Sequence, residues 1–322
     1  MPRVEKSEKP IPAPKKVSVI VAVHDQEGEL SDLHAELYAT LTDYARPFEI
    51  IYVDDGSTDA TWQELRTIAQ ADPSVRVVKM RAPFGEASVL DAGVKLAQGE
   101  CIAYFTCRVR VKPGDIVRLL ARLDEGYDVV LGVRSPRRDS RLNQFVSRLF
   151  NGMTNYFMEL HLSDINSGVL AARKEVFDHV PFYGSLNAFI PVMAHKQGYK
   201  IIEEKVEQLP GRFNQSLYLK DYIRRFLDLI SVIFLSKYSK KPLHFLGFVG
   251  AVFTIVGAAI NLYLFFYRVM GIGGIAGKPM LLLGTMLLII GIQMISIGLL
   301  GEIIIFTHAR NIKEYNIEEI IE

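Results

Sequence analysis

Acidic side chains follow two apolar, β-branched runs of the sequence, at positions where they could bind a nucleotide. His24-Asp25-Gln26-Glu27 follows VSVIVAV, and Asp54-Asp55-Gly56-Ser57-Thr58-Asp59 follows FEIIYV. Carboxylates at strand ends accept hydrogen bonds from a base or a ribose, and Gly56 allows a tight turn. Capping of the next helix by Thr58 or Asp59 would explain one acidic residue, but it leaves the pair Asp54-Asp55 unexplained.

Basic side chains follow a third apolar run, CIAYF. Thr106 and Cys107 come first, and Arg108, Arg110 and Lys112 then stand at alternate positions. In an extended segment alternate side chains face the same side. Three cations pointing one way could clamp a diphosphate directly; the alternative is that they only solvate a loop.

Alternating strand and helix patterns would position these groups. Strands are expected at residues 17–23, 48–54, 75–80, 101–106 and 127–133, and helices at 30–44, 61–71, 87–98 and 115–124. This alternation, with continuous apolar strands, predicts an α/β fold with a mostly parallel, Rossmann-like sheet covered on both faces. In such sheets ligands bind beyond the carboxyl ends of the strands, where the acidic and basic groups stand.

Two long apolar runs, 243–267 and 280–306, predict a pair of C-terminal transmembrane helices. The first has no Asp, Glu, Lys or Arg, and the second is interrupted only by Gln293 and Glu302. Each has about 25 residues, enough to span roughly 30 Å of hydrocarbon. Basic residues predict cytoplasmic termini because they gather at the outer ends of the two runs: Lys237, Lys240, Lys241, Arg310 and Lys313. Residues 217–238 combine apolar and basic faces, which suits an interfacial helix or, alternatively, a packing helix of the globular domain.

Composition limits the partners and the compartment. The chain has 322 residues and a formal net charge of +1, so it has no basic excess for binding nucleic acid. Cys101 and Cys107 cannot build a disulfide framework and are expected to be reduced thiols in the core of a cytosolic domain. The predicted division is a disordered lead-in (1–16), an α/β domain (17–212), a juxtamembrane amphipathic segment (213–241), a transmembrane hairpin (242–307) and a cytosolic tail (308–322).

Six segments resemble, in order, those of a known family. They are VSVIVAVHDQEGEL, EIIYVDDGSTDAT, APFGEASVLDAGVKLAQGE, YDVVLGVRSPRRDS, SDINSGV and RFNQSLY, with IGLLGEIIIFTHAR near the C-terminal end. Together they resemble the polyprenyl-phosphate glycosyltransferases among the inverting family-2 enzymes. The resemblance implies a GT-A fold, a nucleotide-sugar donor, a polyprenyl phosphate acceptor and direct displacement with inversion. It also implies a multi-pass protein of the inner (plasma) membrane with a cytoplasmic catalytic domain, and a homo-tetramer, as often found among two-span bacterial members.

The resemblance also assigns site residues. Those expected to bind the nucleotide-sugar are Asp25, Asp54, Asp55, Gly85, Arg108 and Arg110, and those expected at the acceptor and its phosphate are Arg134, Arg148, Arg212 and Ser216. Asp164 is the expected catalytic residue, near the acceptor. A lipid phosphate needs no strong general base, so Asp164 would orient the acceptor or a cation; a turn-forming Asp is the alternative.

One signature of the family is missing. A D-x-D motif normally follows the fourth strand and holds a divalent cation against the donor diphosphate. Here Thr106 and Arg108 stand at the two carboxylate positions, and Arg110 replaces a Gln. Magnesium and manganese prefer hard oxygen ligands, so no metal is expected in the family's manner and no cofactor is predicted.

Two hypotheses follow from this departure. In the first, Arg108, Arg110 and Lys112 replace the cation, and the protein is a metal-independent transferase. In the second, the chain is a degenerate, non-catalytic homologue that binds a lipid phosphate or a partner as a membrane scaffold. Contacts of Arg108 and Arg110 with a diphosphate would favour the first hypothesis. Structural salt bridges that fill the donor pocket would favour the second.

Overall fold

The structure, a computed structural model, describes residues 16–107, 111–137, 141–158, 160–180, 186–209, 241–275 and 277–308, with isolated residues between 226 and 234. Most of the expected lead-in, of the juxtamembrane segment and of the cytosolic tail lies outside these residues. The chain divides into two compact units, Met1–Leu229 and Ile230–Glu322, which we describe separately.

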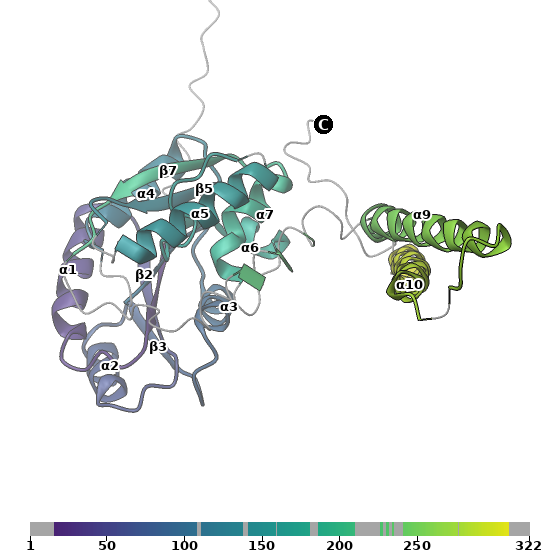
Figure 1. Cartoon of the computed structure of the whole chain (residues 1–322). Coiled ribbons are helices and arrows are strands. Elements are labelled where there is room, and N and C mark those ends of the chain that lie inside the picture. Colours follow the sequence, from purple (N-terminus) through teal and green to yellow (C-terminus); the bar gives the residue numbers. More distant parts are fainter. Residues whose placement is uncertain are drawn as a thin grey trace, which may run out of the picture. The chain divides into compact units, whose positions relative to one another are not determined.

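A seven-stranded sheet forms the centre of the first unit (Figure 1). Its strands are β1 (Val17–Val23), β2 (Phe48–Asp54), β3 (Val75–Lys79), β4 (Cys101–Thr106), β5 (Val129–Arg134), β6 (Val169–Arg173) and β7 (Ile201–Val206). They lie in the order β3-β2-β1-β4-β6-β5-β7. Only β6 pairs antiparallel with its neighbours among these strands. The predicted α/β fold with a mostly parallel sheet is confirmed, although β6 and β7 were not predicted.

Helices cover both faces of this sheet. They are α1 (Leu30–Asp43), α2 (Thr61–Ala71), α3 (Glu86–Leu96), α4 (Asp115–Asp124), α5 (Arg141–Met158), α6 (Lys174–His179) and α7 (Ile190–Lys196), with a 3-10 turn η1 (Leu186–Phe189). The odd-numbered side chains of β1 share one buried cluster with α1, α2 and α4. Ile20 points to the other face and lies so close to Gly93 of α3 that a Cβ there would be 2.5 Å from it. The four predicted helices are confirmed within two residues, whereas α5, α6 and α7 were not predicted.

The register of the sheet brings the predicted site residues to one edge. Val23 at the end of β1 pairs with Asp54 at the end of β2, and Ala22 pairs with Thr106 at the end of β4. Because these neighbouring strands are parallel, their carboxyl ends are level. The loops that follow β1, β2 and β4 therefore meet at this edge.

The second unit is a helical hairpin of α9 (Pro242–Val269) and α10 (Pro279–His308). Both helices are long and apolar enough to cross a membrane, with mean hydropathies of 2.1 and 2.3, which agrees with the two predicted spans. Gly250, Gly257 and Leu264 are buried on α9 at intervals of seven residues. A Cβ on Gly257 would lie 2.6 Å from the Gly284 carbonyl oxygen, and one on Gly250 would lie 2.7 Å from that of Gly291. The two helices thus touch backbone to backbone, as small residues permit in membranes.

Replacing Gly257 by Leu is expected to separate the two helices, because the new side chain meets backbone that cannot move aside. Overpacking of this kind costs about 1–3 kcal/mol, so amide hydrogen exchange in the α10 segment around Gly284 should accelerate roughly tenfold. Mass spectrometry of the detergent-purified chain measures this exchange. Gly247→Leu is the matched control, since its Cβ would approach only Leu243 of the same helix. Equal exchange in both variants would contradict the packing described here.

Candidate active site

The loop after β2 is built around two buried carboxylates. Asp54 accepts hydrogen bonds through Oδ1 from the backbone N–H and the hydroxyl of Ser57. Asp55 accepts from the backbone N–H of Phe84 at 2.7 Å and from that of Gly85 at 3.0 Å. Asp55 thereby ties the end of β2 to the loop before α3, and it fixes Gly85, which precedes α3 with φ +91°. Both aspartates shape the edge where a nucleotide is expected.

The Asp54 carboxylate can accept a further hydrogen bond. Its Oδ2 is buried and has no hydrogen-bond partner among the described residues. A buried carboxylate oxygen without a partner is costly, and such groups often serve a ligand. This oxygen lies at the strand edge where the expected nucleoside would place its N–H and O–H donors.

Asp25 lies at the rim of the same edge. Its backbone has φ +49°, a left-handed conformation that Asp tolerates better than most residues. Its Oδ1 accepts from the Thr58 N–H at 2.8 Å, and its own N–H donates to Ser57 Oγ. The loops after β1 and β2 therefore form one hydrogen-bonded unit. The structure thus brings together Asp25, Asp54, Asp55 and Gly85, four of the residues expected to bind the nucleotide-sugar.

The end of β4 has no carboxylate where the family's metal ligands would stand. Thr106 and Cys107 are buried, and the Cys107 N–H donates to the Ala22 carbonyl oxygen at 2.9 Å. Burial raises the pKa of the Cys107 thiol to about 12, so it stays protonated and is a poor ligand. Within the described ranges no three His, Cys, Asp or Glu side chains gather in a cluster suited to a metal. Thr106 and Cys107 do not fit a divalent cation; Arg108 and Arg110 lie outside the described residues.

A buried ion pair joins the end of β5 to the loop before β6. Arg134 donates from Nε to Asp164 Oδ2 at 2.7 Å and from Nη2 to Oδ1 at 2.8 Å. The exposed fractions are 8% for Arg134 and 1% for Asp164. The Arg137 guanidinium lies 3.7 Å from Asp164 Oδ1 and donates to Ser147 Oγ. Both oxygens of Asp164 thus face arginine side chains.

Side chains of helix α5 hold the loop that carries Asp164. Asn151 donates to the Ser163 carbonyl oxygen at 2.6 Å, and Asn155 exchanges two hydrogen bonds with the backbone of Leu162. Arg148 is exposed on the same helix and donates to the Gln144 carbonyl oxygen. The structure therefore brings Arg134 and Asp164 together, whereas Arg148 bonds to a residue of its own helix. Arg212 and Ser216 lie outside the described residues.

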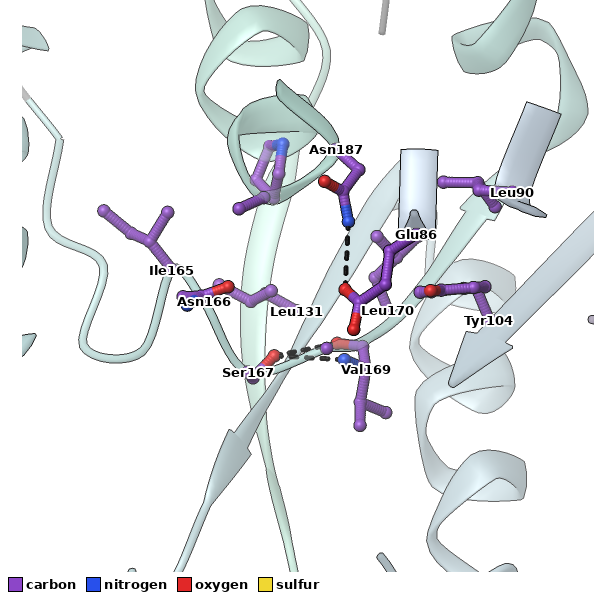
Figure 2. Close-up of a pocket in the computed structure, with 13 residues that line it drawn as sticks. Glu86, Leu90, Tyr104, Leu131, Ile165, Asn166, Ser167, Val169, Leu170 and Asn187 are labelled. Carbon is purple, nitrogen blue, oxygen red and sulfur yellow. Dashed lines mark hydrogen bonds between the residues drawn. The ribbon is translucent and has the colours of Figure 1, made fainter. Parts of the chain in front are cut away.

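A pocket that the sequence analysis did not anticipate opens beside these loops (Figure 2). Glu86 of α3 points into it and accepts a hydrogen bond from Asn187 Nδ2 at 3.2 Å. Tyr104, Ser167, Leu131 and further side chains, most of them apolar, complete the lining. Glu86 directly follows Gly85, and Ser167 stands three residues after Asp164; both lie inside resembling segments, and this proximity was the available signal for them. Asn187 offered no such signal.

Comparison with known proteins points to one family. The Glycosyl transferase family 2 model matches residues 18–181, just over half of the chain. The undecaprenyl-phosphate 4-deoxy-4-formamido-L-arabinose transferase of Klebsiella pneumoniae is 29% identical, over 96% of this chain and 95% of that protein. The dodecaprenyl-phosphate galacturonate synthase of Rhizobium johnstonii is 29% identical, over 92% of this chain and 89% of that protein.

Solved structures share the fold of the first unit. Glucosyl-3-phosphoglycerate synthase from Mycobacterium tuberculosis, in complex with uridine diphosphate, superimposes with a TM-score of 0.54 at 19% identity, over 69% of this chain and 80% of that one. Mannosyl-3-phosphoglycerate synthase from Rubrobacter xylanophilus gives 0.55 at 14% identity, over 68% and 73%. The sheet order, the site at its edge and the extent of the family match lead to one conclusion: the chain belongs to glycosyl transferase family 2 and is a glycosyltransferase.

Proposed function

We propose that this protein transfers a sugar from a nucleotide-sugar to a polyprenyl phosphate at the membrane surface, with inversion. The observation that carries the proposal is the length of the similarity to polyprenyl-phosphate sugar transferases. It covers 96% of this chain and 95% of the Klebsiella protein, so it includes α9 and α10 as well as the sheet domain. A soluble acceptor would give the two apolar helices no part in the reaction.

The donor binds at the edge formed by the ends of β1, β2 and β4. Asp54 Oδ2 and the rim carboxylate of Asp25 accept hydrogen bonds from the nucleoside, while Asp55 keeps the loop before α3 in place. The diphosphate lies toward the segment after β4. Val111 forms a bridge with Gln208, and the Lys112 N–H donates to the Glu207 carbonyl oxygen, so the residues that follow this segment are fixed to the chain after β7.

Cations of the protein stabilise the leaving group. Arg108, Arg110 and Lys112 donate hydrogen bonds to the diphosphate as charge builds up on it, which is the task that a divalent cation performs in enzymes with two carboxylates at this position. The transfer is therefore metal-independent. Thr106 and the protonated thiol of Cys107 support this proposal because neither is a good ligand for a hard cation.

The acceptor phosphate binds near Arg134 and Arg137. Asp164 holds the two guanidinium groups in place, and Arg137 is the more exposed of the two. A phosphate oxygen of the lipid attacks the anomeric carbon, the bond from that carbon to the nucleoside diphosphate breaks, and its electron pair leaves with the diphosphate. The attacking oxygen is already anionic near neutral pH, so no side chain has to remove a proton.

The membrane placement belongs to the same proposal. The protein crosses the inner (plasma) membrane twice, with both termini and the sheet domain on the cytoplasmic side, and assembles as a homo-tetramer. The basic residues that flank α9 and α10 support this orientation. At the opposite ends of the two helices stand Arg268, in the last turn of α9, and Lys278, directly before α10, which are fewer positive charges than at the outer flanks.

A transfer assay with the full chain tests the proposal. Purified protein in detergent is incubated with undecaprenyl phosphate and, one at a time, radiolabelled UDP-glucose, UDP-galactose, UDP-N-acetylglucosamine and GDP-mannose. We expect a labelled, lipid-extractable product from at least one donor, and undiminished yield in the presence of EDTA. No lipid product, together with no binding of UDP or GDP by calorimetry, would overturn the transferase and favour the scaffold.

A further inference from the structure

Helix α5 reverses the usual arrangement of a surface helix, in which apolar side chains face the core and polar ones face outward. Its inner side is largely polar. Asn151 and Thr154 are buried, and Asn151 and Asn155 form hydrogen bonds with the backbone of Ser163 and Leu162. Hydrogen bonds therefore contribute much of what holds α5 to the sheet domain.

The outer side of α5 is apolar. Phe145, Leu149 and Tyr156 have exposed fractions of 60%, 58% and 82%. Together with Gly152, which is also exposed, they follow one another at intervals of four, three and four residues, so they lie in one stripe along the helix. Single exposed apolar side chains are common, but a contiguous group of them marks a surface that binds a partner or a membrane.

A positive charge borders this α5 stripe. Arg148 is exposed and directly precedes Leu149, and its Nε donates to the Gln144 carbonyl oxygen. The other N–H groups of the guanidinium can therefore be offered to an anion. Aromatic and aliphatic side chains bordered by a basic one are typical of a helix that lies in the headgroup layer of a membrane. The long Arg side chain can follow the apolar surface while its charge stays among the headgroups.

The place of α5 in the proposed reaction favours a membrane over a protein partner. Arg137 donates to Ser147 Oγ of α5 and lies 3.7 Å from Asp164 Oδ1, so α5 is next to the proposed acceptor phosphate site. The phosphate of a membrane lipid lies in the headgroup layer. A protein surface that receives this phosphate must reach the same layer, and α5 belongs to that surface.

We propose that α5 lies in the headgroup layer of the bilayer, with Phe145, Leu149 and Tyr156 among the lipids and Arg148 at an anionic headgroup. This inference rests on the proposed function, because it brings Arg137 to the depth of the acceptor's phosphate. It assigns Arg148 to the bilayer instead of to the acceptor. Both sides of α5 then meet surroundings that suit them: protein backbone for the polar side, and lipid for the apolar side.

Fluorescence quenching by brominated lipids tests this contact in the full chain. Trp62 is replaced by Phe, and Phe145→Trp or Leu149→Trp is added. Each protein is reconstituted into nanodiscs of phosphatidylcholine and phosphatidylglycerol, with or without bromine on the acyl chains. We expect the new tryptophan to lose about half of its emission in the brominated discs, because the apolar face of an interfacial helix reaches the boundary between headgroups and acyl chains.

Leu96→Trp in the same background is the matched control. Leu96 is an exposed apolar residue at the end of α3, close to Gln98, whose N–H donates to Glu49 near the start of β2. It thus lies at the edge of the sheet opposite to the acceptor site, and its emission should not change. Unquenched emission at positions 145 and 149 would overturn the inference. A blue shift would then show that protein, such as a second copy of the chain, covers α5, and a red shift would show that water does.

A kinetic comparison connects α5 to the acceptor. In nanodiscs, Phe145→Ser with Leu149→Ser should raise the KM for undecaprenyl phosphate about fivefold and leave kcat and the KM for the donor unchanged, because these side chains touch no reacting atom. Leu96→Ser should change neither KM, and the Tm followed at Trp62 should stay at its wild-type value in both variants. An unchanged lipid KM in the double variant would overturn the link between α5 and the acceptor.

The two measurements separate this inference from the proposed function. Transfer to the lipid without quenching at positions 145 and 149 would overturn the placement of α5 alone. Quenching at both positions, in a chain that binds no nucleotide and forms no lipid product, would overturn the proposed function and still support a membrane-bound α5.

Discussion

Asp164→Ala is expected to destabilise the sheet domain by about 3–5 kcal/mol, because it leaves the buried guanidinium of Arg134 without its counter-charge. The two side chains form a bidentate pair at 2.7 and 2.8 Å, and each is more than nine-tenths buried. The variant should also lose transfer activity, since Arg137 loses the carboxylate that lies 3.7 Å from it.

Fluorescence of the single tryptophan reports on this domain in the intact chain. Trp62 lies half-buried on α2, in the sheet domain, and the helical hairpin has no tryptophan. Thermal unfolding followed at Trp62 should show a clearly lower Tm for Asp164→Ala. The charge-free pair Arg134→Met with Asp164→Leu should recover most of the Tm, as hydrophobic replacements of buried ion pairs do, yet remain inactive. An Asp164→Ala variant as stable as the wild type would contradict the buried pair.

The isosteric variant Asp164→Asn tests whether this residue positions arginines or acts as a base. If it positions them, the KM for polyprenyl phosphate should rise more than the KM for the donor, and the pH profile of kcat should keep its shape. Loss of an acidic limb from that profile, with both KM values unchanged, would instead assign a proton transfer to Asp164.

The sequence predicted the first half of the sheet well because its pattern is local. Each of the five expected strands is a short β-branched run, and the first four are each followed by a helical pattern with its own periodicity, so period and length suffice. β6 and β7 were not predicted from the sequence because their pairing is not local. β6 (Val169–Arg173) lies between β4 and β5 and runs in the opposite direction, and β7 has mostly half-buried residues with three charges in IIEEKV and no alternating pattern.

The site shows the same division between local pattern and long-range contact. The sequence predicted that Asp54 and Asp55 stand at the end of a strand, and in the structure β2 ends at Asp54. It gave no means of seeing that Asp55 accepts from the N–H groups of Phe84 and Gly85, about thirty residues further on. Arg134 and Asp164 were assigned separate tasks, whereas they form one buried pair across 30 residues. Asn187, which meets Glu86 across 101 residues, lies beyond any argument from local spacing.

The double variant Arg108→Ala with Arg110→Ala is expected to weaken nucleoside diphosphate binding about 100-fold, because each charge-assisted hydrogen bond to a phosphate contributes about 1.5–3 kcal/mol. Calorimetry with UDP and UMP distinguishes the phosphate from the nucleoside. Binding of UMP should fall much less, because the β-phosphate is absent and the nucleoside is held by Asp54 and Asp25. Arg66→Ala removes one positive charge from the exposed face of α2 and serves as the control; it should leave both affinities unchanged.

Placing carboxylates at positions 106 and 108 should make nucleotide binding depend on a metal ion, if basic side chains of this protein now take the place of that ion. In Thr106→Asp with Arg108→Asp, two hard oxygen ligands return to the two positions that carry carboxylates in the family's D-x-D motif. We expect this variant to bind UDP only weakly in EDTA and to regain affinity when Mn²⁺ is added, whereas the wild type should bind equally well in both. Wild-type binding that disappears in EDTA would contradict a metal-independent site, and it would require ligands other than Thr106 and Cys107, because one is a neutral hydroxyl and the other a protonated thiol.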